Sequence, residues 1–222
     1  MTEDRAQKIL KVLQGTFKIP KWTTSTRDPF RTLIVTIISQ NTADRNTSRA
    51  FENLSNRFEI TAEALANAKT GQMEECLKTA GLHRNKSKAI KQVSRIIFEK
   101  YSGDLGRILT LPFEEARETL LQLPGVGPKT ADVLLLFSAR KPTVPVDTHV
   151  NRVSKQLGLA PTSGDYETVR EVLQSLYNSR DYLAVHILLI QHGRQYCKAR
   201  RPLCKPCPVN NLCPSRNLWD KQ

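Results

Sequence analysis

Long apolar runs are missing from this 222-residue sequence, in which hydrophobic residues make up 39%. No segment approaches the roughly 18–20 apolar residues that a membrane-spanning helix needs. Residues 1–14, MTEDRAQKILKVLQ, have the pattern of a charged amphipathic helix and lack the apolar centre of a signal peptide. Strand-like alternation of polar and apolar residues is also missing. We therefore expect a globular, all-α protein that stays in the cytoplasm and has no membrane partner.

Acidic residues are scarce relative to basic ones. The chain has 21 Asp and Glu against 34 Lys and Arg, which gives a formal net charge of +13 and a pI of about 9.8. A domain this basic usually binds a polyanion, and nucleic acid is the leading candidate. The alternative is that the excess charge only keeps the protein soluble.

Cysteine is almost absent before residue 197. The single earlier one, Cys76, is expected to be a buried core thiol. The other four form a C-x6-C-x2-C-x5-C array of Cys197, Cys204, Cys207 and Cys213. A disulfide framework is not expected in a reducing compartment, so the array indicates a metal site. A zinc ribbon normally has two C-x2-C pairs, and four unevenly spaced thiolates suit an iron-sulfur cube at least as well, so the spacing leaves both metals open.

Helical periodicity extends along most of the chain. Residues 28–39 begin with Asp-Pro, a good cap and first turn, and are apolar nearly all round, which predicts a central buried helix. Further helices are expected over residues 61–68, 71–81, 84–100, 113–122, 129–139, 148–157, 165–178 and 181–195.

Two of these helices are joined by a glycine-rich turn in residues 123–135, LPGVGPKTADVLL. The N–H groups at the start of the second helix have no partner within the helix, so an anion such as a DNA phosphate is stabilised there. We expect Gly125 and Gly127 to allow a positive φ and a close approach of the sugar-phosphate backbone, and Pro128 to suit the first helical turn. The alternative is a tight turn between helices that binds nothing.

Lys129 is unusual because it places a cation at the positive end of a helix dipole. That position should favour the neutral amine, which is a nucleophile and forms Schiff bases with carbonyl-type carbon. The alternative is a lysine that binds phosphate or is merely solvated. Asp147, in the segment VPVDTHVNRV, is expected to be a helix N-cap that can also act as an acid/base group for that amine.

Three motifs in order, LPGVGPKTADVLL, VPVDTHVNRV and the four-cysteine array, resemble the endonuclease III branch of the helix-hairpin-helix DNA glycosylases. The resemblance extends from about Phe30 to Cys213. It implies that Lys129 is the nucleophile, that Asp147 is its acid/base partner and that the four cysteines hold a 4Fe-4S cluster. Pro128 departs from the arginine that often precedes this lysine in the family.

The same resemblance implies two loops that probe DNA. IISQNTADRN resembles the loop that fills the gap left by a flipped nucleotide, through Gln40 or its neighbour Asn41. TAGLHRNKSKAI resembles the loop that wedges the opposite strand through Leu82, for which the alternative is a core leucine at a helix C-cap. The remaining positions expected to contact DNA are His83, Gly125, Val126, Gly127 and Thr130.

A dense basic segment lies within the cysteine array. Its lysines and arginines would repel one another unless phosphates approach, so we expect Arg200 and Arg201 to contact DNA. The alternative is a solvated loop.

The resemblance implies two helical lobes with DNA in the cleft between them. One is a six-helix domain over 26–139 with the hairpin, and the other a cluster domain from 1–25 and 140–222. The expected protein is a monomer that acts on double-stranded DNA containing damaged bases or abasic sites. It would remove oxidised pyrimidines and cleave 3′ to the abasic site by β-elimination. The alternatives are a monofunctional thymine or adenine mismatch glycosylase and a non-catalytic DNA-binding module.

Overall fold

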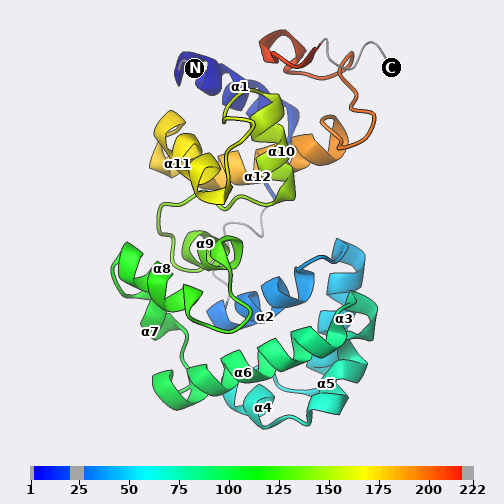
Figure 1. Cartoon of the computed structure of the whole chain (residues 1–222), viewed down its shortest axis with the longest axis vertical. Helices are drawn as coiled ribbons and strands as arrows, with labels where there is room; N and C mark the ends of the chain where they lie inside the picture. Colours follow the sequence, from blue (N-terminus) through cyan, green and yellow to red (C-terminus); the bar gives the residue numbers. More distant parts are fainter. Residues whose placement is uncertain (1–2, 21–27, 217–222) are drawn as a thin grey trace. The chain divides into compact units, whose positions relative to one another are not determined.

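The computed structural model describes residues 3–20 and 28–216. Over these residues all regular structure is helical, which confirms the all-α fold class. The chain divides into two compact units, Thr26–Lys141 and Met1–Ser25 with Pro142–Gln222 (Figure 1). The expected boundary at 25/26 falls within residues 21–27, which lie outside the described residues. No helix in the described part of the chain is long and apolar enough to span a bilayer.

Within the described residues, the unit Thr26–Lys141 contains six helices of eight residues or more and two shorter ones, α4 and α7. Its helices are α2 Pro29–Ser39, α3 Asp44–Arg57, α4 Ala62–Asn67, α5 Thr70–Leu77, α6 His83–Tyr101, α7 Gly106–Leu109, α8 Phe113–Leu121 and α9 Pro128–Phe137. A 3-10 turn, η2 Lys78–Ala80, precedes α6.

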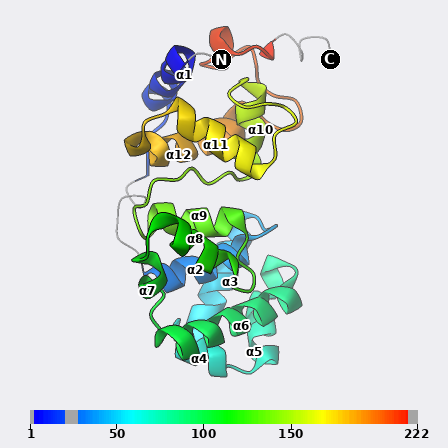
Figure 2. The same cartoon turned by 60° about the vertical axis from the view of Figure 1, so that its left-hand side comes forward.

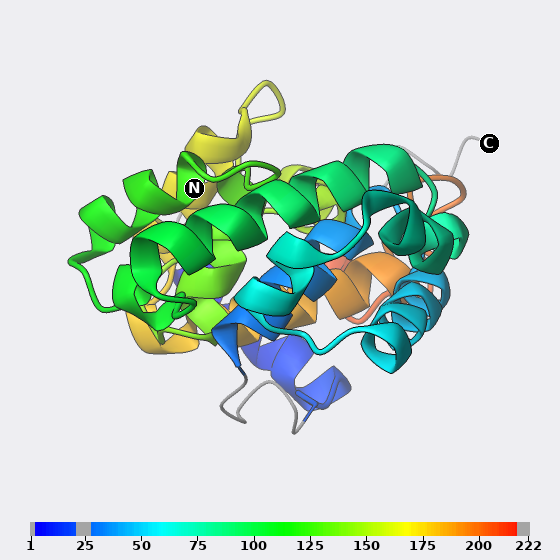
Figure 3. The same ribbon diagram turned by 90° about the horizontal axis from the view of Figure 1, so that it is seen from below.

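Helix α2 lies at the centre of this unit and packs against α3, α6 and α9. Asp28 caps it, because its Oδ1 accepts from the Phe30 N–H at 2.8 Å, and Pro29 occupies the first turn. Leu33 and Ile34 are fully buried, as the apolar pattern on every side of this helix predicts. The long α6 packs on α4 and α5, and Figure 3 shows these helices side by side.

Helix α3 was not expected from the sequence. Its sequence, DRNTSRAFENLSNR, is mostly polar, and only Thr47, Ala50 and Leu54 are buried. These residues keep the helical spacing of three and four positions, but they are few in a segment that is otherwise polar.

The other unit is built on α12 Tyr182–Gln195, which packs against α1 Glu3–Thr16 and α10 Thr148–Gln156 (Figure 2). Helix α11 Tyr166–Leu176 and the 3-10 turns η3 Ser179–Asp181 and η4 Asn210–Leu212 complete it. Arg5 ties α1 to η4 and to the turn after α10, since its Nη1 donates to Leu212 O and its Nη2 to Gly158 O, both at 2.9 Å.

Candidate functional site

Helices α8 and α9 are joined by the glycine turn. Gly125 has φ +77°, the left-handed region that favours glycine, and a Cβ there would lie 2.9 Å from Ala89 Cβ on α6. Gly127 has φ −100° and ψ 179°, so the expectation of a positive φ at both glycines is correct only for Gly125. Gly127 is the N-cap of α9, and a Cβ there would meet nothing within 4 Å.

The absence of a side chain at Gly127 leaves the N-terminus of α9 open to an approaching anion. Pro128 takes the first helical position and Lys129 the next, so the lysine lies in the first turn, as the sequence predicted. Lys129 is partly buried. The helix start thus combines N–H groups that have no partner within the helix with an amine beside them.

A buried ion pair fixes α8 against α9. Arg117 Nε lies 2.9 Å from Asp132 Oδ1, and Arg117 Nη2 lies 3.4 Å from Asp132 Oδ2. The Asp132 side chain is fully buried and that of Arg117 is 12% exposed. This pair, which was not expected from the sequence, holds the helix that carries Lys129 in a defined orientation.

Two hairpin positions expected to contact DNA have buried side chains. Val126 is 6% exposed and Thr130 is 2% exposed, so neither side chain is available to a ligand. The Val126 N–H donates to Leu123 O at 3.1 Å. Val126 therefore shapes the turn, and Thr130 can contact DNA only through its main chain.

The two glycines make a matched pair for mutation. Gly125→Ala should lower the free energy of unfolding by about 2 kcal/mol or more, because it strains the left-handed position and clashes with Ala89. Gly127→Ala should leave stability nearly unchanged and weaken binding to abasic duplex DNA, because its methyl group occupies the approach to α9. Urea unfolding and fluorescence anisotropy measure the two effects, and equal stability of the variants would contradict this account.

Gln40 and Asn41 lie between α2 and α3. Gln40 Nε2 donates to Gly125 O at 2.9 Å, with Thr130 Oγ1 at 3.4 Å, so this side chain is tied to the hairpin. Asn41 is exposed and has φ +53°. The structure therefore anchors one of the two gap-filling candidates to the hairpin and exposes the other.

Leu82 precedes α6 and is 57% exposed, with φ +46°. The alternative of a core leucine is therefore wrong. His83 opens α6 and is partly buried. A left-handed backbone at a residue other than glycine costs about 1–2 kcal/mol, and such strain is concentrated at functional sites.

Asp147 stands at the end of an extended segment that is fixed in the core of its unit. The carbonyl oxygen of Pro145 lies 2.8 Å from Nδ1 of the buried His186 on α12, and Val146 is 6% exposed. Asp147 then caps α10, since its Oδ1 accepts from the Val150 N–H at 2.7 Å, as the sequence predicted. The carboxylate is partly exposed and makes no other hydrogen bond within the described residues.

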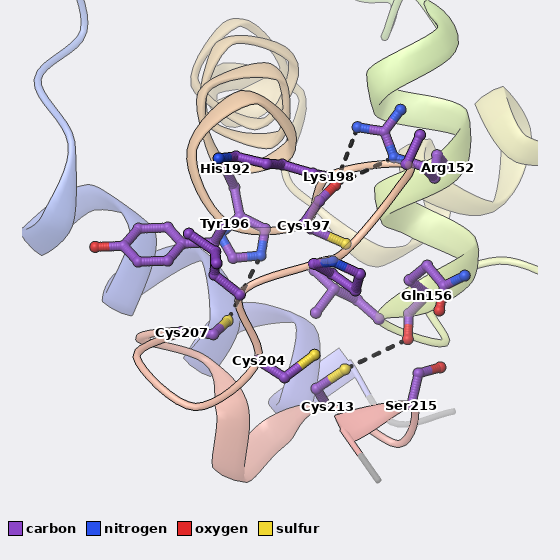
Figure 4. A pocket seen from close by; sticks show the side chains of 14 residues that line it. Arg152, Gln156, His192, Tyr196, Cys197, Lys198, Cys204, Cys207, Cys213 and Ser215 are labelled. Atoms are coloured by element: carbon purple, nitrogen blue, oxygen red, sulfur yellow. Dashed lines mark hydrogen bonds between the residues drawn. The ribbon is translucent and has the colours of Figure 1, made fainter. Parts of the chain in front are cut away.

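The four clustered cysteines line one cavity of about 110 Å³. Figure 4 shows their sulfur atoms turned toward the same space. Burial raises the pKa of the Cys197 thiol to about 11, and burial also raises the pKa values of Cys207 and Cys213. These thiols are therefore protonated at neutral pH unless a metal displaces their protons.

Polar groups hold the main chain around this cavity. Arg152 Nε donates to Cys197 O at 3.1 Å, and Asn210 Nδ2 donates to Cys204 O at 2.7 Å. His192 Nε2 lies 3.8 Å from Cys207 Sγ, and burial lowers the pKa of His192 to about 4, so its ring is neutral at pH 7.

The sequence left two metals open, zinc and an iron-sulfur cube, and four thiols around one cavity are a donor set for either. Four thiolates at about 2.3 Å from one zinc ion lie about 3.8 Å apart. Within the described residues, no group of three or more His, Cys, Asp or Glu side chains could hold one metal ion. Four cysteine thiolates are also the ligands of a 4Fe-4S cluster, so the donor set fits that group.

The basic segment expected to meet DNA is exposed. Arg200 and Arg201 both lie on the surface, and Arg201 has φ +52°. Residues 196–209, all described, contain no helix or strand. Hydrogen bonds within the segment help to set its conformation, such as the bond from the Leu203 N–H to Tyr196 O at 2.9 Å.

Comparisons with known proteins agree with this arrangement. Residues 34–179 match the family model of the HhH-GPD superfamily base excision DNA repair proteins. The endonuclease III of Thermotoga maritima is 37% identical and covers 96% of this chain and 92% of its own length. The endonuclease III of Sulfolobus acidocaldarius is 35% identical and covers 85% of this chain and 82% of its own length. The chain is also similar to endonuclease III in a trapped covalent intermediate with DNA, with a TM-score of 0.87, 28% identity and 98% of each chain covered.

Proposed function

Since this chain belongs to the endonuclease III family within the HhH-GPD superfamily of base excision DNA repair proteins, we propose that it removes oxidised pyrimidines and then cuts the strand 3′ to the abasic site. It is a DNA glycosylase and lyase that acts on damaged double-stranded DNA. The observation that carries the finer proposal is the place of Lys129, in the first turn of a helix whose N-terminus Gly127 leaves open.

Lys129 supplies the nucleophile. Its neutral amine attacks C1′ of the flipped nucleotide, the C1′–N bond breaks, and the base leaves with a proton. The sugar ring opens to an imine between Nζ and C1′. Loss of a proton from C2′ then expels the 3′-phosphate by β-elimination. Asp147 is the acid/base group that accepts and returns protons in these steps.

The two loops make the nucleotide accessible. A base inside a duplex must be flipped out, at a cost of a few kcal/mol. We assign gap filling to residues 40–41, the gap loop, and intercalation into the opposite strand to residues 81–82, the wedge loop. The exposed Leu82 supplies the apolar surface that replaces lost stacking.

The four cysteines hold a 4Fe-4S cluster in this proposal. When bound, the cluster supplies a rigid anchor for residues 196–209. Purified protein should be yellow-brown and contain about four irons per chain. Zinc without iron, measured by elemental analysis, would contradict the assignment.

Arg200 and Arg201 bind phosphate in this proposal. Replacing both by Ala should weaken binding to every DNA sequence alike and lower the slope of log K against log salt by about 1–2. Anisotropy titrations at several salt concentrations measure that slope, with Arg180→Ala, an exposed arginine of the same unit, as the control. An unchanged slope would exclude a role in DNA contact.

The proposed function is tested on labelled duplexes that contain thymine glycol, a thymine mismatch, an adenine mismatch or an abasic site. Base release from thymine glycol together with a β-eliminated 3′ end is expected. Release from a mismatch without a nick would indicate a monofunctional glycosylase. Binding without base release or nicking would indicate a non-catalytic DNA-binding module.

A further inference from the structure

Lys86 is a lysine buried inside the unit Thr26–Lys141, with 4% of its surface exposed. Its Nζ lies 2.8 Å from Ile38 O, 2.9 Å from Ala80 O and 2.5 Å from Thr42 Oγ1. A lysine ammonium has three N–H donors, so each donor has one acceptor. All three acceptors are neutral, and burial lowers the pKa of the ammonium. Burying a cation is unfavourable, so a purely packing role would suit an apolar side chain better.

The three acceptors belong to two segments. Ile38 and Thr42 flank the gap loop, and Ala80 directly precedes the wedge loop. The Thr42 hydroxyl strengthens this connection, because its Oγ1 lies 2.6 Å from Ala80 O and 3.0 Å from Gln40 O. One ammonium and one hydroxyl therefore join the two loops.

Both loops contain a residue in the left-handed region. Asn41 has φ +53° and Leu82 has φ +46°. Such conformations persist only where the surroundings hold them. The gap loop is also attached to the hairpin through the bond from Gln40 Nε2 to Gly125 O.

We propose that Lys86 is a positioning residue that fixes the gap loop and the wedge loop relative to each other, so that both enter the duplex together when a nucleotide is flipped. This rests on the proposed function of the two loops. Loops that were not linked would each have to become ordered when the DNA binds, which costs conformational entropy. Loops that Lys86 already holds in place lose less entropy on binding. Lys86 does not touch DNA and acts through the two loops.

The test uses Lys86→Met in the full chain, which keeps the length and apolar stem of the side chain and removes the three donors. Single-turnover base release is measured on a duplex with thymine glycol paired to adenine, and nicking is measured on the same duplex with an abasic site. We expect release to fall about 10²-fold and nicking to fall less than about threefold, because an abasic site has no base to unstack. Lys100→Met, an exposed lysine at the other end of α6, is the matched control and should change neither rate.

A second variant tests whether a slower rate in Lys86→Met comes only from a general loss of stability. Thr42→Val keeps the shape of the side chain and removes the hydroxyl, so it should give a smaller loss in the same direction. Thermal unfolding is recorded for each variant, and the rates are measured at temperatures where all are folded. If Lys86→Met does not fold, the rates of base release and nicking by Thr42→Val test the proposal.

A second readout follows the loops directly. 2-Aminopurine opposite an abasic site reports unstacking of the opposite strand, and its fluorescence should rise with wild type and rise less with Lys86→Met. The proposal would be overturned if Lys86→Met lowered the rates of base release and of nicking by the same factor. It would also be overturned if both variants released the base within about threefold of the wild-type rate. If the wild type does not nick abasic DNA, the proposed function itself is contradicted. If the wild type is active and both variants release the base at the wild-type rate, only the proposed link between the loops is contradicted.

Discussion

Replacing Lys129 by glutamine is expected to abolish both the nick at an abasic site and the covalent adduct that borohydride traps. An amide nitrogen cannot form an imine with C1′, so neither β-elimination nor reduction to a stable amine can follow. Glutamine keeps a polar side chain in the first turn of α9. Binding to abasic duplex DNA should therefore weaken by less than about tenfold, the effect of losing one cation near the phosphates.

The control for this variant is Lys100→Gln, which removes the same charge from the exposed end of α6. It should nick and form the adduct as wild type does. Denaturing gels of the borohydride reaction show both products at once. An adduct that persists in Lys129→Gln would mean that another amine carries out the chemistry.

Replacing Asp147 by asparagine should slow base release by about 10²-fold or more, because a positioned acid/base group contributes that much. The fold should be preserved, because asparagine caps a helix as well as aspartate and can accept the same bond from the Val150 N–H. Single-turnover rates and thermal unfolding separate the two effects.

Asp165 offers a matched control in the same unit. It caps α11 by accepting from the Thr168 N–H at 2.9 Å. Hydrogen bonds from the side chain and the main-chain N–H of Thr168 lower the pKa of its carboxyl. Asp165→Asn makes the same chemical change at a cap outside the proposed chemistry and should leave the rate unchanged. If both substitutions changed the rate of base release by the same small factor, Asp147 would be only a structural cap.

Much of the fold and of the candidate site could be predicted because local rules and tertiary packing agree there. Helix α2 has a cap, a proline in its first turn and an apolar sequence on every side, and the structure buries it at the centre. The first turn of α9 and the cap at Asp147 were predicted for the same reason, since each depends on residues adjacent in sequence.

The rest depends on contacts between segments far apart in the chain. The turn pattern predicted the positive φ of Gly125 but not its close approach to Ala89 on α6, and Gly127 needs no special φ. Lys86 had a usable signal, because it lies four residues before the buried Ile90 and therefore on the apolar face of α6. Its partners, however, are main-chain oxygens of other segments. Leu82 was predicted by resemblance, and only its exposure excluded a core position.

The most direct test of the account is to identify the amino acid that carries the sugar after borohydride trapping. The adduct formed with an abasic duplex is digested with nuclease and protease, and the modified peptide is sequenced by mass spectrometry. The account predicts a deoxyribose remnant on Nζ of Lys129, in the peptide that begins the helix after the glycine turn. A remnant on any other amine, or base release and nicking with no adduct, would contradict it.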